Sequence, residues 1–200
     1  MIGDNLPRGI GYKSSWLTIK APIEQVLEVL FLKEVSDISF EEGLKVIRAY
    51  GNNSVLVWSY TTKDLTYLLG NSIEQLTYDE NILHNLATAF KEVHLFFTHR
   101  VSEAHGFARL INGEIERAYF YDEDRIFSSG AITNTEKQLG INLPNDFDEM
   151  WENWNNEAFT KINEDVIISL AEQWTAIEST KEQYVNVKIG QMNIDFFKQR

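Results

Sequence analysis

The chain has 200 residues, no cysteine and a formal net charge of −12. The lack of cysteine excludes disulfide bonds, thiolate metal sites and cysteine nucleophiles, and no apolar run approaches the roughly 18 residues of a membrane-spanning helix. The N-terminal sequence has no apolar stretch behind a basic start, so we expect no secretory signal, a cytoplasmic location and one domain over residues 1–200.

Segments in the first half of the chain alternate between strand and helix patterns. The β-rich run 14–21 predicts a strand, and residues 21–32 carry apolar residues at helical spacing. Two β-branched and aromatic runs within residues 44–61 flank the turn-forming letters GNNS, which predicts a hairpin. Residues 77–93 predict a helix that begins after Asp79, a residue suited to capping helix N-termini.

Three strand-like segments follow one another directly, over residues 93–100, 104–111 and 115–122. The letters NGE at residues 112–114 are typical of a tight turn between the second and third segments. Consecutive strands joined by short turns pair antiparallel. We therefore predict a three-strand meander at the centre of an antiparallel sheet.

The last third of the chain returns to helix patterns and then to a strand. Thr133 and Glu136 have the spacing of a capping box at the start of a short helix. Residues 145–159 and 163–177 predict two further helices, and residues 182–197 regain strand character. Helices and strands do not alternate regularly and hairpins dominate, so we predict an α+β fold whose helices pack mainly on one face of the sheet.

Negative charge is concentrated in one part of the chain. Residues 114–182 hold sixteen Asp and Glu against five Lys and Arg, whereas the rest holds fourteen against thirteen. This balance argues against nucleic-acid binding, which requires clustered basic residues. It favours a basic protein partner, because opposite potentials raise association rates, although an acidic surface also simply increases solubility.

A strand ending in Thr-His-Arg-Val is followed by Glu-x-His-x-x-Ala-Arg, a glycine turn and an Arg-Ala-Tyr strand. With a short Glu-containing helix and a later helix ending in tryptophan, this pattern resembles a family of uncharacterised bacterial proteins over about residues 55–180. Thr175 replaces the serine that follows the tryptophan in that family. The resemblance implies a bacterial origin and an intact domain, and it implies no chemistry. The matching positions are Thr98, His99, Arg100, Val101, Glu103 or Ala104, His105, Ala108, Arg109, Arg117, Ala118, Glu136, Leu139, Gly140, Val166, Ala171 and Trp174.

Three of the four histidines fall within residues 93–105. Strand alternation places His99, Glu103 and His105 on one face and His94 on the other, unless a bend changes the parity. Two histidines and a carboxylate can bind a metal, but their spacing matches no established ligand motif. We therefore predict no metal site here, and leave open a hydrogen-bonded strand end or a ligand-binding corner.

Arginines are the second candidate group for a ligand site. Adjacent strands of the predicted meander carry Arg100, Arg109 and Arg117. From these positions the guanidinium groups could bind an anion or a carboxylate through bidentate hydrogen bonds. The alternative is that they pair with local acids such as Glu103, Glu114 or Glu116. The complete set of candidate ligand-binding residues is His99, Arg100, Glu103, His105, Arg109 and Arg117.

The acidic helix predicted over residues 145–159 also contains tryptophan. Aromatic side chains among carboxylates make good anchors for a basic partner surface, although buried tryptophans with a solvated acidic flank would give the same pattern. Asp146 and Asp148 could also be read as an acid–base pair, for which their spacing gives weak support. The predicted partner-binding residues are Asp146, Asp148, Glu149, Trp151, Glu152, Trp154 and Glu157.

The common catalytic motifs are missing from the sequence. It contains no phosphate-binding loop, no dinucleotide-binding glycine pattern, no nucleophile elbow and no His-Glu-x-x-His. We therefore expect a non-enzymatic interaction protein without catalytic residues or a cofactor, specifically an immunity-type inhibitor that binds a basic toxin or effector. The alternatives are a DNA-mimicking inhibitor in phage conflict, and a small-molecule- or metal-binding enzyme or sensor using the corner at His99, Arg100, Glu103 and His105. No nucleic-acid or membrane partner is expected, and the sequence does not indicate an oligomeric state.

Overall fold

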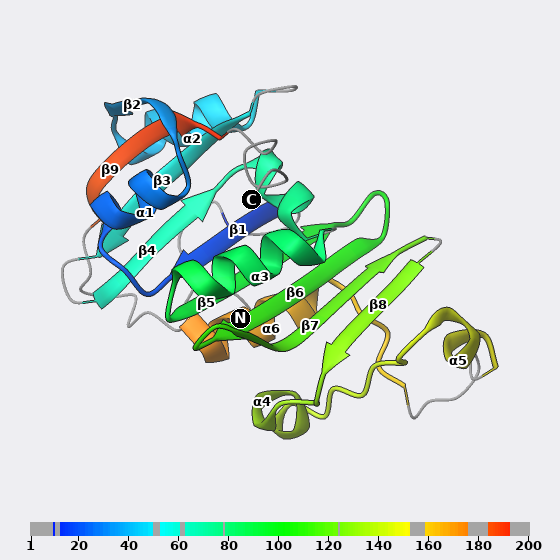
Figure 1. Ribbon diagram of the computed structural model, residues 1–200. Coiled ribbons are helices and arrows are strands. Elements are labelled where there is room, and N and C mark those ends of the chain that lie inside the picture. Colours follow the sequence, from blue (N-terminus) through cyan, green and yellow to red (C-terminus); the bar gives the residue numbers. More distant parts are fainter. Residues whose placement is uncertain are drawn as a thin grey trace.

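A continuous antiparallel sheet runs through the computed structural model (Figure 1). The structure describes residues 10, 13–49, 53–60, 63–77, 79–123, 125–152, 159–175 and 184–192. Within these residues the sheet has nine strands, and every neighbouring pair is antiparallel. In order across the sheet they are β2 (Lys33–Asp37), β9 (Tyr184–Gln191), β3 (Ser54–Tyr60), β4 (Lys63–Leu69), β1 (Lys13–Ile19), β5 (Glu92–His99), β6 (Ala104–Ile111), β7 (Glu114–Asp122) and β8 (Arg125–Gly130).

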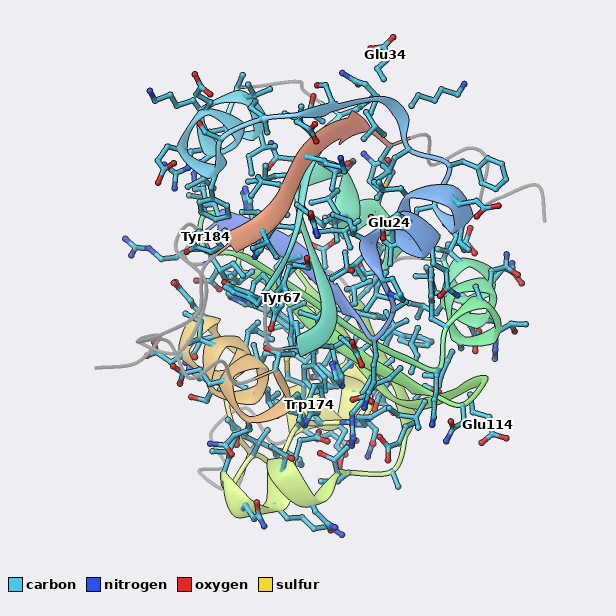
Figure 2. The ribbon with its side chains drawn as sticks, turned by 90° about the vertical axis from the view of Figure 1, so that its left-hand side faces the viewer. Glu24, Glu34, Tyr67, Glu114, Trp174 and Tyr184 are labelled. Atoms are coloured by element: carbon cyan, nitrogen blue, oxygen red, sulfur yellow. The ribbon has the colours of Figure 1, made fainter. Side chains whose placement is uncertain are left out.

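Helices cover both faces of this sheet, as Figure 2 shows with the sheet nearly edge-on. One face packs against α1 (Ile23–Val29), the 3₁₀ helix η1 (Asn71–Leu76) and α3 (Glu80–Ala89). The other face packs against α2 (Phe40–Ile47) and α6 (Glu164–Thr175). Two short helices, α4 (Asn134–Gln138) and α5 (Phe147–Glu152), lie near the β8 edge in Figure 1.

The α+β class, the antiparallel sheet and the meander of β5, β6 and β7 are confirmed. The distribution of the helices differs from the prediction that they pack mainly on one face. The physical reason is visible in β1, where Trp16 belongs to the core under α2 and α6 and Leu17 belongs to the core under α1 and α3. Both side chains are fully buried, so helices have to pack on both faces of the sheet.

The core on the α6 face is built around a row of aromatic residues. Trp16 on β1 pairs in register with Phe96 on β5, which pairs with Phe107 on β6. The ring centroids of Trp16 and Phe96 lie 5.1 Å apart, a stacked arrangement that adds to the hydrophobic gain. Trp174 of α6 packs on Phe96 and Phe107, and its position between α6 and the sheet is marked in Figure 2. This aromatic packing fixes α6 against the meander.

Local capping signals in the sequence are confirmed. The side chain of Asp79 accepts a hydrogen bond from the Asn81 amide at the start of α3. Thr133 and Glu136 form the predicted capping box at α4, with the Thr133 amide donating to Glu136 Oε2 at 2.8 Å. Such contacts depend on residues three or fewer positions apart, so the sequence is sufficient to predict them.

The hairpin predicted over residues 44–61 is wrong. The run up to Ile47 belongs to α2, which begins after Ser39, whose hydroxyl accepts from the Glu42 amide. Phe40 and Ile47, seven positions apart, are both buried, which is helical rather than strand periodicity. The strand β3 instead pairs with β4 and β9.

None of the helices in the described parts of the chain is long and apolar enough to cross a membrane.

Candidate functional site

The connection between β5 and β6 decides where the histidines point. Thr98 pairs directly with His105, so these two residues share a face of the sheet. His94, four residues before Thr98 on β5, lies on that same face, whereas His99 lies on the opposite one. The prediction that His99 and His105 share a face while His94 lies apart is therefore wrong, because residues 100–103 form a turn and interrupt the alternation.

His99 has a local role in this turn. Its Nδ1 lies 2.6 Å from the Ser102 hydroxyl, and the Ser102 amide donates to the same nitrogen at 3.3 Å. Glu103 completes the turn with a positive φ of 48°. His99 thus contributes to holding the two strands in register, as the strand-end alternative proposed. Among the described residues, no group of three or more histidine and acidic side chains is arranged to hold a metal ion.

The other two histidines of this stretch are buried on the α6 face. His94 Nδ1 lies 3.2 Å from the Thr18 hydroxyl, and His105 Nδ1 lies 2.9 Å from the Thr98 hydroxyl. Burial lowers the pKa of each imidazole to about 4. Both rings are therefore neutral at pH 7, and each keeps a hydrogen-bonding partner on the neighbouring strand.

The three candidate arginines do not form a common anion site. Arg117 is buried, and its Nε donates to Glu136 Oε1 at 3.0 Å. Arg109, its neighbour in register, pairs with Glu116 at 2.8 Å and lies over the Trp174 ring. Both guanidinium groups therefore have carboxylate partners inside the chain, which confirms the pairing alternative for Arg109 and Glu116. Arg100, in the turn after β5, lines a cavity.

A cavity of about 560 Å³ opens next to this turn, between the ends of the meander strands and the start of α6. Three residues of the predicted corner, Arg100, Glu103 and His105, line this cavity. The fourth, His99, lies on the opposite face of the sheet. The sheet side is formed by Arg100, Glu103, His105, Tyr119 and Tyr121, and the opposite wall by Pro144, Met150 and residues 159–165. The meander turn and the segment before α6 therefore form the two walls of one open cavity.

Glu164, the first residue of α6, is the most unusual group in this cavity wall. Its side chain is buried, with only 6% of the residue exposed, and within the described residues its Oε1 has no hydrogen-bond partner. Burial and the adjacent Asp165 raise the pKa of Glu164, whereas Arg100 acts in the opposite direction. Sequence reasoning missed this residue, because an acid in the first turn of a helix is normally exposed and stabilises the helix dipole.

Two tyrosines supply the aromatic part of the wall. Burial raises the pKa of Tyr119 and of Tyr121, so both phenols stay protonated at neutral pH. Among nearby charges, Arg117 lowers the pKa of Tyr119 and the weaker effect of Glu149 raises it. On Tyr121 the carboxylates of Glu103, Glu123 and Asp122 all raise the pKa, so negative potential reaches the Tyr121 side of the cavity.

The acidic segment forms α5 beyond the β8 edge of the sheet (Figure 1). Trp151 is 58% exposed, and the flanking Asp148 and Glu152 are exposed as well. The alternative of a buried tryptophan with an acidic flank is therefore wrong for Trp151. Trp154 and Glu157, which the sequence grouped with these residues, lie outside the described residues.

Two of the predicted partner-binding acids also hold α5 together. Asp146 Oδ1 accepts from the Glu149 amide at 2.7 Å, and its backbone carbonyl accepts from the Met150 amide, as at a helix N-terminus. Glu149 in turn accepts from the amide and the side chain of Asn145. The pairing of Asp146 with Asp148 as an acid and a base gains no support from these contacts, because Asp146 is a capping residue.

A second cavity of about 590 Å³ adjoins α5 on the other face of the sheet, beside α3. Its walls combine apolar side chains of α3, β7 and β8 with four carboxylates and one arginine. Met150 of α5 lines the first cavity, while Phe147 lines the second. The charged residues of the second cavity are Glu80, Asp122, Asp146, Asp148 and Arg125.

Comparisons with known proteins give no match. No protein-family model, no curated protein sequence and no solved structure matches the chain.

Proposed function

We propose that this chain is a binding protein that takes a small polar organic molecule into the cavity between the meander and α6. The observation that carries the proposal is Glu164, a buried carboxylate in the cavity wall whose Oε1 has no hydrogen-bond partner within the described residues. Buried polar groups in folded proteins are normally hydrogen-bonded, and exceptions gather at functional sites. A bound molecule would supply the missing partner.

The size and the lining of the cavity support this proposal. Ligand sites in proteins typically measure about 300–1,000 Å³ and combine apolar walls with a few polar groups. Here Tyr119, Met150 and Phe159 provide apolar surface, while Glu164 and neutral His105 provide polar groups with shifted pKa values. A sensor and an enzyme both have to bind a small molecule. A ligand titration therefore tests the first requirement of both alternatives.

Filling the cavity is expected to abolish ligand binding. We expect that NMR titrations with small aromatic and aliphatic amines, alcohols and acids will shift resonances of residues around His105 and Glu164. Met150→Trp, which places a larger side chain in the cavity, is expected to remove those shifts. Val46→Trp is the matched control, because Val46 lies on α2 and is not part of the cavity wall. Shifts that persist in Met150→Trp, or no shifts with any compound, would contradict the proposal.

A second function, binding of a basic protein partner through α5, is favoured by the exposure of Trp151. A large aromatic residue that is 58% exposed between Asp148 and Glu152 has the composition of an interface anchor in an acidic surface. The carboxylates of the second cavity extend this acidic surface to the other side of α5. An immunity-type inhibitor of a basic toxin is the specific form of this proposal, because electrostatic steering speeds such association.

Loss of the Trp151 side chain is expected to weaken such a complex about 30-fold, as truncation of an interface anchor costs about 2 kcal/mol or more. The measurement is surface plasmon resonance of a purified basic partner, identified by affinity capture, against wild type and Trp151→Ala. Val101→Ala is the control, because Val101 is 72% exposed but is not surrounded by the acids of α5. Equal affinities for wild type and Trp151→Ala, or affinity that does not fall with added salt, would rule out this function.

A further inference from the structure

We propose that the ligand of the cavity between the meander and α6 carries a positively charged nitrogen, as an ammonium or guanidinium group, that binds to Glu164. This inference rests on the proposed binding function of the same cavity and specifies the chemical class of the ligand. It is built from three features of the wall: the unpartnered carboxylate, the surplus of acidic groups and the aromatic surface.

The carboxylate defines what the ligand must offer. An ionised carboxylate only accepts hydrogen bonds, so the partner missing from Glu164 Oε1 is a donor. Desolvation makes a buried charge costly unless it is paired, and hydrogen bonds from charged donors to carboxylates are about twice as strong as neutral ones. Arg100 is near enough to affect the ionisation of Glu164, yet Oε1 has no donor within the described residues.

Acidic groups around the cavity outnumber basic ones. Glu103, Glu164 and Asp165 line it, against Arg100 and Lys161. Glu149 of α5 adds a further negative charge that acts on Tyr119, while the stronger opposite effect on that ring comes from Arg117, whose charge is already paired with Glu136. The local balance therefore favours a cation over an anion, in agreement with the acidic character of residues 114–182.

The remaining walls favour an organic cation over a metal ion. Tyr121 and Phe159 supply aromatic surface, and cations are attracted to the faces of such rings. The Tyr119 ring already has the Arg117 guanidinium 5.7 Å from its centroid. A volume of about 560 Å³ is far larger than a metal ion needs, and no cluster of three metal-binding side chains was found among the described residues. A charged nitrogen on an apolar or aromatic body matches both the carboxylate and the rings.

Such a group has two sources, a free amine or a basic side chain of a protein partner. Met150 lines the cavity and the next residue is the exposed Trp151, so a partner bound to α5 would have a lysine or arginine within reach of the cavity. The chemistry at Glu164 is the same in both cases. The experiment therefore includes one arm for each source.

Three probes that share a phenyl ring separate charge from shape: benzylammonium, benzyl alcohol and benzoate. Isothermal titration calorimetry and NMR titration of the full chain are expected to show that benzylammonium binds at least tenfold more tightly than benzyl alcohol, and that benzoate does not bind. Glu164→Gln keeps the shape of the side chain and removes its charge. It is expected to weaken benzylammonium about 10- to 100-fold and to leave benzyl alcohol unchanged, since hydrogen bonds to charged groups are worth about 1.5–3 kcal/mol.

Two further variants keep the test conclusive. Glu172→Gln, on the same helix but outside the cavity wall, is expected to bind benzylammonium like wild type. Asp165→Asn alters an exposed residue of the wall, so it is expected to fold normally and to weaken benzylammonium about two- to threefold through the lost long-range attraction. If Glu164→Gln fails to fold, the preference for benzylammonium over benzyl alcohol and the effect of Asp165→Asn decide the question.

The outcomes distinguish this inference from the proposed function. Binding of benzyl alcohol or benzoate in preference to benzylammonium would overturn the inference while the binding function stands. Absence of binding by every probe in every titration would overturn both. For the source, butylguanidinium is compared with the peptide acetyl-glycyl-arginyl-glycinamide, because each carries one guanidinium and no other charge. Tighter binding of butylguanidinium supports a free small-molecule cation and tighter binding of the peptide supports a protein-borne side chain, whereas failure of both together with benzylammonium would overturn the inference.

Discussion

Replacing Arg117 with methionine is expected to lower the free energy of unfolding by about 3–5 kcal/mol, the range observed when one partner of a buried ion pair is removed. Arg117 and Glu136 are 3% and 1% exposed at their side chains and are joined at 3.0 Å. The same guanidinium donates to the Ser128 hydroxyl at 2.9 Å and to backbone carbonyls of β7 and β8. Methionine would leave the Glu136 carboxylate buried without its cation and these acceptors without their donor.

Urea unfolding monitored by circular dichroism measures this effect. Arg125→Met is the matched control, because Arg125 lies on the neighbouring strand β8 and pairs with Asp122 at the surface. An exposed ion pair contributes about 0–1 kcal/mol, so this control is expected to unfold close to wild type. Equal losses in Arg117→Met and Arg125→Met would show that the buried pair has no special role in joining α4 to the sheet.

Acid is expected to destabilise the protein through His94 and His105 in particular. The pKa of each is lowered from 6.5 to about 4 in the folded state. Between these values the unfolded chain binds more protons than the folded chain, so stability is fully present above pH 6.5 and falls as the pH is lowered toward 4. Each histidine is expected to contribute a loss of up to about 3 kcal/mol over this window, from 1.36 kcal/mol per pKa unit.

Variants that cannot titrate at these positions isolate the effect. His94→Gln and His105→Gln keep a hydrogen-bonding group opposite Thr18 and Thr98. We expect each variant to show a shallower dependence of the unfolding free energy on pH between 6.5 and 4, and the double variant to show the shallowest. Carboxyl groups that titrate in the same window are common to all four proteins and cancel in the comparison. An unchanged pH dependence in the double variant would mean that these histidines are protonated without cost in the folded state.

Features that depend on residues close together in the chain could be predicted from the sequence. Asn112 and Gly113 both adopt positive φ values, 53° and 91°, as the letters NGE at the turn between β6 and β7 indicated. The caps at Asp79 and Thr133 and the apolar stripe of α6 are equally local. Each of these features depends on hydrogen bonds or on periodicity over a few neighbouring residues. The amino-acid sequence alone is therefore sufficient to predict them.

The sequence by itself therefore determined the α+β class, the meander and most helix starts, together with the acidic character of the region around α5. Only the tertiary structure decided which charged groups meet. It paired Arg117 with Glu136, nineteen positions later, and placed His99 and His105 on opposite faces of the sheet. It also buried Glu164 beside a cavity whose walls come from distant segments. These outcomes depend on strand register and on packing over long sequence distances, which no local pattern specifies. Three of the four residues of the predicted corner line this cavity, and the buried Glu164 in its wall comes from α6.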